Sequence, residues 1–228
     1  MSRKVRVQIY TAQTPTEATA LAGLGVDHVG VTPANLGLPG EVAPAAARAI
    51  CDALKGEARA VALTVSTVPD EILEMVERVG PDILHLCGPP GVLQPADVAR
   101  LRDRLGDVEI MQAVAVDGPG AVGVAASFEP VVDYLLLDSV APGIPGIGAA
   151  GTVHDWALSA EIVQQVSVPV ILAGGLSASN VDEAIRVVDP WGVDSLTHTN
   201  RPLEGGRFSK DLEAVRAFVR AAKYTAST

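Results

Sequence analysis

The 228-residue sequence predicts an α/β protein folded as a single-domain (β/α)8 barrel of the TIM-barrel class. Short runs rich in β-branched residues alternate with alanine-rich amphipathic segments, and eight such pairs follow one another along the chain. The runs at 134–137 and 168–172 are apolar almost throughout, which is typical of parallel strands covered by helices on both faces. Eight units favour closure, and the length suits one barrel of about 250 residues better than two separate cores.

A doubly wound open sheet is the alternative fold. Such a sheet usually carries a glycine-rich phosphate loop after its first strand. In this sequence, residues 10–14 occupy that place and read YTAQT, without a glycine. The barrel is therefore the fold that we expect.

Strands and helices are expected in alternation. Apolar and β-branched runs predict strands at residues 5–9, 27–31, 59–65, 82–86, 109–114, 132–137, 168–172 and 192–195. Amphipathic runs predict helices at residues 15–24, 44–54, 69–79, 95–105, 120–127, 155–166, 178–188 and 210–222. Four of these helices begin at a proline, which suits a first turn because the missing N–H would have no partner there. No linker separates the elements, so we expect one domain over residues 1–228.

The composition excludes several classes of function. The chain has 17 Lys and Arg against 27 Asp and Glu, a net charge of −10, which disfavours nucleic acids and anionic membranes as partners. No apolar run approaches the roughly 20 residues of a membrane-spanning helix, and the first residues do not resemble a secretion signal. Cys51 and Cys87 lie far apart, without disulfide or zinc spacing. We expect a cytoplasmic protein, a monomer or homodimer, that binds no metal and uses no cofactor.

Chemistry in a parallel barrel takes place at the carboxyl ends of the strands. Gly174 and Gly175 end the seventh predicted strand, where backbone N–H groups can approach a phosphate closely. Asp138 ends the sixth, before a glycine-rich stretch, and an apolar mouth would raise its pKa toward that of a general acid or base. A plain glycine turn and a capping aspartate are the alternative interpretations.

A set of short motifs follows one another along nearly the whole chain. These are VQIY at 7–10, residues 84–88, LLDS at 136–139, the glycines from 148 to 151 before Asp155-Trp156, LAGGL at 172–176 with Asn180-Val181, GVD at 192–194 and Lys210-Asp211. In their order and spacing these motifs resemble those of the phosphoribosylanthranilate isomerase family, the single-domain barrels of tryptophan biosynthesis. The family reaction is an Amadori rearrangement, in which an acid opens a phosphorylated aminoribose and a base removes the C2 proton.

The resemblance implies roles for some residues and reveals departures at others. Asp138 matches the family's general acid, whereas Tyr10 stands where the family has its cysteine base and Gln8 where it has a lysine. Residues 38–42 contain no counterpart of the arginine that meets the anthranilate. Residues 196–198 replace the serine-serine-glycine phosphate segment, and Thr197 and Arg201 are expected to bind the phosphate in its stead.

Further side chains are candidates for the mouth of the barrel. His198 lies beyond strand eight and is the preferred histidine for proton transfer near pH 7. His85 and Cys87 share one face of strand four and are expected to line the site, although an interior histidine and an apolar filler are the alternatives. Gln112 is expected to line the mouth from strand five, and Gln8 of strand one is expected to contact the substrate.

These residues predict an isomerase of the aldose–ketose type that acts on a small phosphorylated sugar or sugar-derived metabolite by acid/base enolisation. Asp138, Tyr10 and His198 are its expected catalytic residues. A genuine phosphoribosylanthranilate isomerase with an unusual base is one alternative. A barrel that binds a phosphometabolite without turnover is the other.

Overall fold

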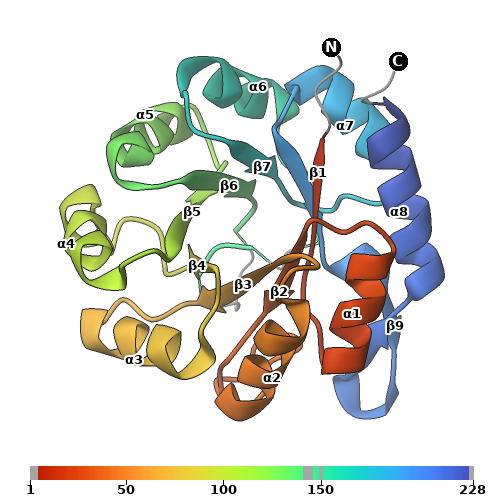
Figure 1. The fold of residues 1–228 in the computed structure, drawn as a ribbon. Coiled ribbons are helices and arrows are strands. Elements are labelled where there is room, and N and C mark those ends of the chain that lie inside the picture. Colours follow the sequence, from red (N-terminus) through yellow and green to blue (C-terminus); the bar gives the residue numbers. More distant parts are fainter. Residues whose placement is uncertain (1–4, 141–145, 149–150, 226–228) are drawn as a thin grey trace.

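Eight parallel strands close into one barrel, and the helices surround it (Figure 1). The structure is a computed structural model that describes residues 5–140, 146–148 and 151–225. The strands are β1 (Arg6–Ile9), β2 (His28–Val31), β3 (Arg59–Thr64), β4 (Ile83–Leu86), β5 (Glu109–Ala115), β6 (Tyr134–Asp138), β7 (Val170–Leu172) and β8 (Gly192–Ser195). The helices are α1 (Pro15–Gly23), α2 (Pro44–Leu54), α3 (Pro69–Val79), α4 (Pro95–Leu105), α5 (Gly120–Phe128), α6 (Trp156–Gln165), α7 (Val181–Val188) and α8 (Leu212–Thr225).

The barrel is closed by the first and last strands. Gln8 of β1 lies opposite His28 of β2 on one side and opposite Asp194 of β8 on the other. The predicted (β/α)8 class is confirmed, and the alternative of an open doubly wound sheet is wrong because the pairing of β1 with β8 closes the sheet and leaves none of the eight strands at an edge. None of the described helices is long and apolar enough to cross a bilayer.

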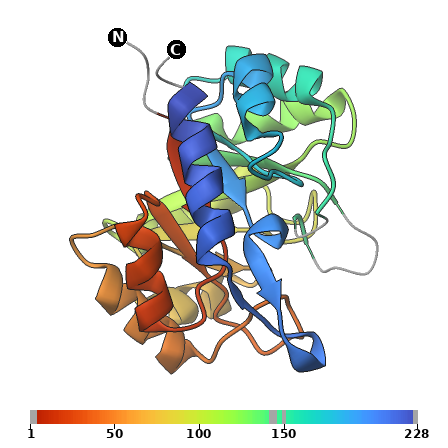
Figure 2. The same ribbon diagram turned by 90° about the vertical axis from the view of Figure 1, so that its right-hand side faces the viewer.

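Two predicted helices begin two or more residues later than the sequence indicates. The helix expected at 178–188 starts at Val181, since Ser177 donates its backbone N–H to Asn180 Oδ1 and the preceding residues form a turn. The helix expected at 210–222 starts at Leu212, because Lys210 pairs with Asn200 in an antiparallel hairpin. This hairpin, of β9 (Asn200–Pro202) and β10 (Phe208–Lys210), was not predicted. It projects from the end of the barrel opposite the C-terminal end of α8 (Figure 2).

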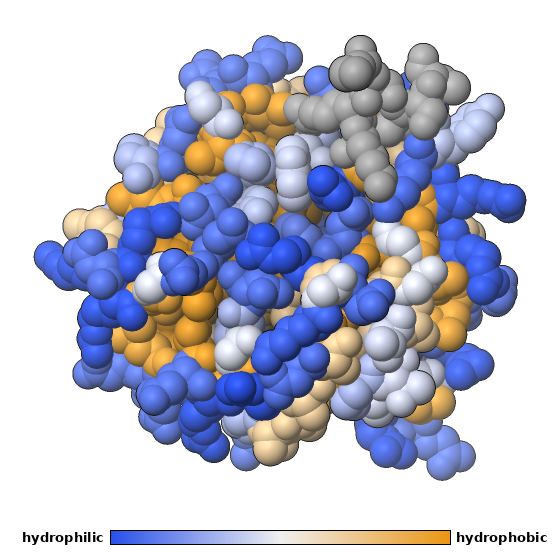
Figure 3. Space-filling view, in the orientation of Figure 1, coloured by the Kyte–Doolittle hydropathy of each residue, from blue (hydrophilic) through white to orange (hydrophobic). Residues whose placement is uncertain are grey.

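Side chains from alternate positions of the strands fill the barrel. The interior cluster includes Val61, Ile83, Met111, Leu136 and Ile171, which block the axis below the mouth. A larger cluster packs the outer faces of the strands against the helices. The face of the molecule seen in Figure 3 is mostly hydrophilic, with hydrophobic residues showing in patches between the hydrophilic ones. The packed interior leaves the carboxyl end of the barrel as the place for a ligand.

Candidate active site

Two cavities meet at the carboxyl end of the barrel, and Asp138 and Asp194 line both of them. The apolar cavity lies toward β1–β4 and is lined by Tyr10, Thr11, Thr32, Leu38, Pro39, Leu63, Val65, His85, Cys87, Leu136, Asp138, Ile147, Gly148, Asp194 and Leu196. The glycine cavity lies toward β7 and β8 and is lined by Asp138, Gly151, Gly174, Gly175, Leu176, Asp194, Ser195, Leu196, Thr197 and His198. The two acids thus stand between a polar end and an apolar end of one site.

Asp138, the last residue of β6, is held between backbone segments. Its Oδ1 accepts a hydrogen bond from the Ser139 N–H at 2.7 Å. A Cβ at Gly148 would lie 2.9 Å from Asp138 Oδ2, and one at Gly174 would lie 3.3 Å from Oδ1, so both glycines make room for the carboxyl group. Burial raises the pKa of Asp138 to about 7. The group can therefore hold or release a proton near neutral pH.

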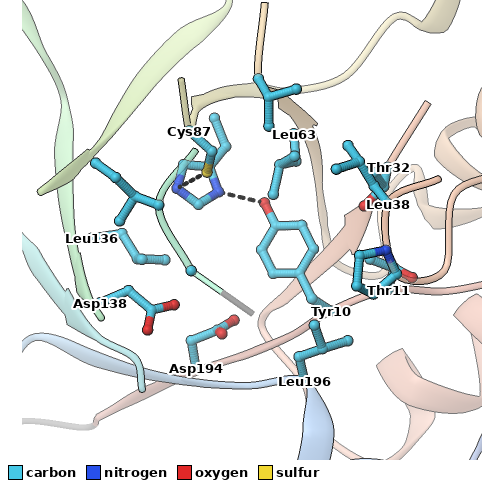
Figure 4. Close-up of a pocket in the computed structure, with 15 residues that line it drawn as sticks. Tyr10, Thr11, Thr32, Leu38, Leu63, Cys87, Leu136, Asp138, Asp194 and Leu196 are labelled. Carbon is cyan, nitrogen blue, oxygen red and sulfur yellow. Dashed lines mark hydrogen bonds between the residues drawn. The ribbon is translucent and has the colours of Figure 1, made fainter. Parts of the chain in front are cut away.

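Asp194 of β8 lies beside Asp138 at the mouth of the barrel (Figure 4). Its Oδ1 is buried and has no hydrogen-bond partner among the described residues. Burial, and to a smaller extent the charge of Asp138, raise the pKa of Asp194 to about 8. We did not predict Asp194 as a site residue, although an acid inside the apolar run of a strand is a signal that burial will perturb it.

Tyr10, His85 and Cys87 form a hydrogen-bonded chain along the opposite wall (Figure 4). The Tyr10 hydroxyl lies 2.8 Å from His85 Nδ1, and His85 Nε2 lies 3.2 Å from Cys87 Sγ. Burial lowers the pKa of His85 to about 3. Burial also raises the pKa of Tyr10 and of Cys87 well above their usual values. All three groups are therefore uncharged at neutral pH.

After β7 the backbone turns sharply at Gly174 and Gly175. Both residues have left-handed backbones, with φ of 82° and 62°, which suit glycine. Within the described part of the chain, their N–H groups have no hydrogen-bond acceptor. Successive unpaired N–H groups in such a turn make a concave site for an anion. The glycine cavity therefore has the donors that a phosphate group needs.

Lys210 lies beneath the mouth and was not predicted as part of the site. Its Nζ donates to the Tyr10 carbonyl oxygen, Thr199 Oγ1 and Asn200 Oδ1. Burial lowers the pKa of Lys210 to about 7. The lysine ties the hairpin to the end of β1, and it does not line either cavity.

The other predicted site residues are spread over different places. Thr197, predicted to bind the phosphate, and His198, predicted to transfer protons, are both exposed and line the glycine cavity. Arg201 is exposed on β9 and is not among the residues lining either cavity. Gln8 lies one interior layer below Tyr10, with Oε1 3.2 Å from His28 Nδ1. Gln112 does not face the mouth, because the alternation of β5 turns it outward into a separate cavity beside α4 and α5.

Among the described residues, no group of His, Cys, Asp and Glu side chains is arranged to hold a metal ion. The side chains that the structure gathers at the mouth are suited to proton transfer and to binding an anion at one end.

Known proteins match this chain in sequence and in structure over nearly its whole length. Residues 8–221 match the family model described as N-(5'-phosphoribosyl)anthranilate (PRA) isomerase. A protein of Haloferax volcanii named N-(5'-phosphoribosyl)anthranilate isomerase is 34% identical over 220 residues, covering 96% of this chain and 93% of the relative. One of the same name from Myxococcus xanthus is 36% identical over 228 residues, covering 96% of each chain. The solved phosphoribosyl anthranilate isomerase of Thermus thermophilus has a TM-score of 0.78 at 25% identity, covering 95% of this chain and 98% of that one.

Proposed function

The chain belongs to the N-(5'-phosphoribosyl)anthranilate isomerase family, and on that premise we propose that it converts an N-substituted phosphoribosylamine into the corresponding amino-deoxyketose phosphate. The observation that carries this proposal is the position of Asp138 and Asp194 between the glycine cavity and the apolar cavity. A substrate whose phosphate lies at the glycine turn would place its sugar carbons beside the two acids.

The reaction needs one proton donor and one proton acceptor. Protonation of the ring oxygen breaks its bond to C1 and leaves an iminium group. Removal of the C2 proton then sends its electron pair into the C1–C2 bond, and the pair of the C=N double bond returns to nitrogen, which gives the enolamine. The enolamine becomes a ketone by taking a proton at C1 and losing the proton of its C2 hydroxyl. Hydrogen moves from C2 to C1, so no oxidant or reductant takes part.

Asp138 and Asp194 are the residues that we assign to these transfers. A catalytic acid or base works best with a pKa near the working pH, and the pKa values of Asp138 and Asp194 are about 7 and about 8. When the pair shares one proton, one carboxyl group is the acid and the other is the base, as in other carboxyl pairs. Following the family resemblance, Asp138 donates to the ring oxygen, and Asp194 takes the C2 proton. Because the pKa of Asp194 is the higher of the two by about one, the productive form, with the proton on Asp138, is the minor form of the singly protonated pair.

Tyr10 has an orienting role in this scheme. Its hydroxyl is hydrogen-bonded to His85, and burial raises its pKa well above 10. The hydroxyl is therefore neutral at the working pH, and a neutral phenol is a poor acceptor for a carbon-bound proton. The hydroxyl lines the apolar cavity and is placed to contact a sugar oxygen. His198 and Thr197 would contact the phosphate.

The proposal is tested by the conversion of two substrates by the purified enzyme, N-(5'-phosphoribosyl)anthranilate and the corresponding aniline derivative, with detection of the ketose phosphate product. We expect conversion of at least one of them. Absence of conversion of both, by a folded protein that binds phosphorylated ligands, would contradict an enzymatic role and favour a binding protein.

A separate growth experiment addresses tryptophan biosynthesis. A bacterial strain that requires tryptophan because it lacks this isomerase is supplied with the gene. Growth without tryptophan would support this physiological role. Failure to grow, with good expression of the folded protein, would exclude that role and leave the chemical reaction open to the first test.

A further inference from the structure

The positive charges at the carboxyl end of the barrel are confined to one segment. In the sequence, the stretches that follow β1 to β7 contain no lysine or arginine; these are residues 10–14, 32–43, 65–68, 87–94, 116–119, 139–155 and 173–180. Of the segments that follow the strands, only the one after β8 contains lysine or arginine, namely Arg201, Arg207 and Lys210. The mouth of the barrel therefore has an unusual shortage of cations for a site that binds a phosphorylated ligand.

The three cations after β8 do not face the apolar cavity. Arg201 and Arg207 are exposed in the β9–β10 segment and are not among the residues that line it. Lys210 is buried, and its ammonium group is bonded to the Tyr10 carbonyl, Thr199 and Asn200. No positively charged side chain in the described structure is therefore available to a ligand group in the apolar cavity.

The residues that line the apolar cavity disfavour a negatively charged ligand group for a second reason. Its wall away from the glycine turn consists largely of Leu38, Leu63, Val65 and Ile147. The ionisable groups that line it, apart from the neutral His85, Cys87 and Tyr10, are the acids Asp138 and Asp194. A carboxylate placed there would lose its hydration without gaining a counter-charge, and it would repel the ionised member of the acid pair.

From this distribution of charge we infer that the group carried on the substrate nitrogen is uncharged and apolar, and that the benzoate group of anthranilate is not the group to which this site is adapted. The inference rests on the proposed function, because it assumes that the phosphate lies at the glycine turn and the substituent at the other end. It assigns the substrate class as phosphoribosylamines of uncharged aryl or alkyl amines. A cationic substituent is disfavoured, since the walls that it would meet are apolar.

Binding measurements with three stable product analogues test the inference. Each analogue is a 1-amino-1-deoxyribitol phosphate, and the three differ in the group on nitrogen: phenyl, 2-carboxyphenyl or 2-(aminomethyl)phenyl. Isothermal titration calorimetry gives the three dissociation constants with the wild-type protein. We expect the phenyl analogue to bind at least about tenfold more tightly than either charged analogue, a difference of about 1.4 kcal/mol. Equal or tighter binding of the carboxyphenyl or aminomethyl analogue would overturn the inference, and so would failure of all three to bind.

A matched pair of variants tests the missing cation itself. Pro39 is exposed at the rim of the apolar cavity, so Pro39→Arg adds a cation there and Pro39→Gln adds a long neutral side chain. Relative to Pro39→Gln, we expect Pro39→Arg to shift the preference toward the carboxyphenyl analogue by about fivefold or more. If the ratio of the dissociation constants is unchanged, the lack of a cation at this rim does not determine which substituent is preferred.

The experiments distinguish failure of the inference from failure of the proposed function. The three dissociation constants report the preference for a substituent, whereas conversion of the phosphoribosylamines reports the reaction. The expected order of binding without any conversion would contradict the proposed isomerisation alone. Conversion with a preference for the anthranilate compound would retain the isomerisation and reject the uncharged substituent.

Discussion

The hydroxyl of Tyr10 lies 2.8 Å from Nδ1 of His85, across 75 positions of the sequence. Tyr10 occupies the place at which the family resemblance leads one to expect the catalytic base. Because its hydroxyl is engaged by a buried, neutral imidazole and its own pKa is raised by burial, Tyr10 is held as a neutral group. In the proposed function, the proton transfers therefore fall to the carboxyl groups of Asp138 and Asp194.

The variant Tyr10→Phe tests this division of roles. It keeps the ring and removes the hydroxyl, so we expect kcat to fall by no more than about tenfold, the size of a lost orienting hydrogen bond. Asp194→Asn removes the base and is expected to lower kcat by about 100-fold or more. Steady-state kinetics of both variants measure the difference. A loss in Tyr10→Phe as large as that in Asp194→Asn would show that Tyr10 itself transfers the proton.

Tyr10 also depends on a glycine of the neighbouring strand. A Cβ at Gly30 would lie 2.1 Å from Cδ1 of Tyr10, so Gly30→Ala forces the ring to move. We expect Gly30→Ala to lower the free energy of unfolding by about 1–3 kcal/mol in urea denaturation. The control is Gly123→Ala on α5, where a Cβ would meet nothing within 4 Å and the change should stabilise the helix slightly.

A double variant establishes the cause of the Gly30 effect. If the clash with Tyr10 is responsible, Gly30→Ala should cost much less when Tyr10→Ala is already present. Equal costs in the two backgrounds would place the strain elsewhere in the strand pair.

The buried acids predict how stability varies with pH. The pKa of Asp194 is about 8 in the folded protein, well above its value near 4 in an unfolded chain. The folded protein therefore keeps a proton that the unfolded chain releases, and the stabilisation present at low pH is lost as the pH rises from about 4 through about 8. We expect Asp194→Asn to reduce this decline by a contribution on the order of a few kcal/mol.

Denaturation of wild type and Asp194→Asn at pH 5 and at pH 8 measures the effect. The matched control is Asp103→Asn, an exposed position on α4, which should retain the wild-type pH dependence. Identical pH dependence in wild type and Asp194→Asn would contradict the raised pKa of Asp194.

The sequence was sufficient to predict the barrel and part of its mouth. The β/α alternation, the prolines at helix starts and the Gly174-Gly175 turn are local signals, and Asp138 follows its strand directly. The roles of Asp194 and Lys210 depend on contacts that form only when the barrel closes. Asp194 comes opposite Gln8 of the first strand, and Lys210 bonds to the carbonyl of Tyr10, 200 positions away.

The β9–β10 hairpin was missed for a similar reason. Its strands are three residues each, too short for a periodic pattern, and they are paired with each other outside the barrel. Gln112 was misplaced because a one-residue shift along a strand turns a side chain to the opposite face. Side-chain direction at a strand end requires the register, which the sequence alone does not supply.

The pH dependence of kcat/KM tests most directly whether Asp138 and Asp194 share one working proton. The singly protonated pair predominates between the two pKa values of about 7 and about 8, so we predict a narrow bell with its maximum there. Activity falls at lower pH because the base is protonated, and at higher pH because the acid is lost. Asp138→Asn should lose about 100-fold or more in kcat and also lose the bell, while it still binds the phenyl analogue. A wild-type profile that lacks one or both limbs would contradict the account. So would an Asp138→Asn variant with the wild-type rate and pH profile.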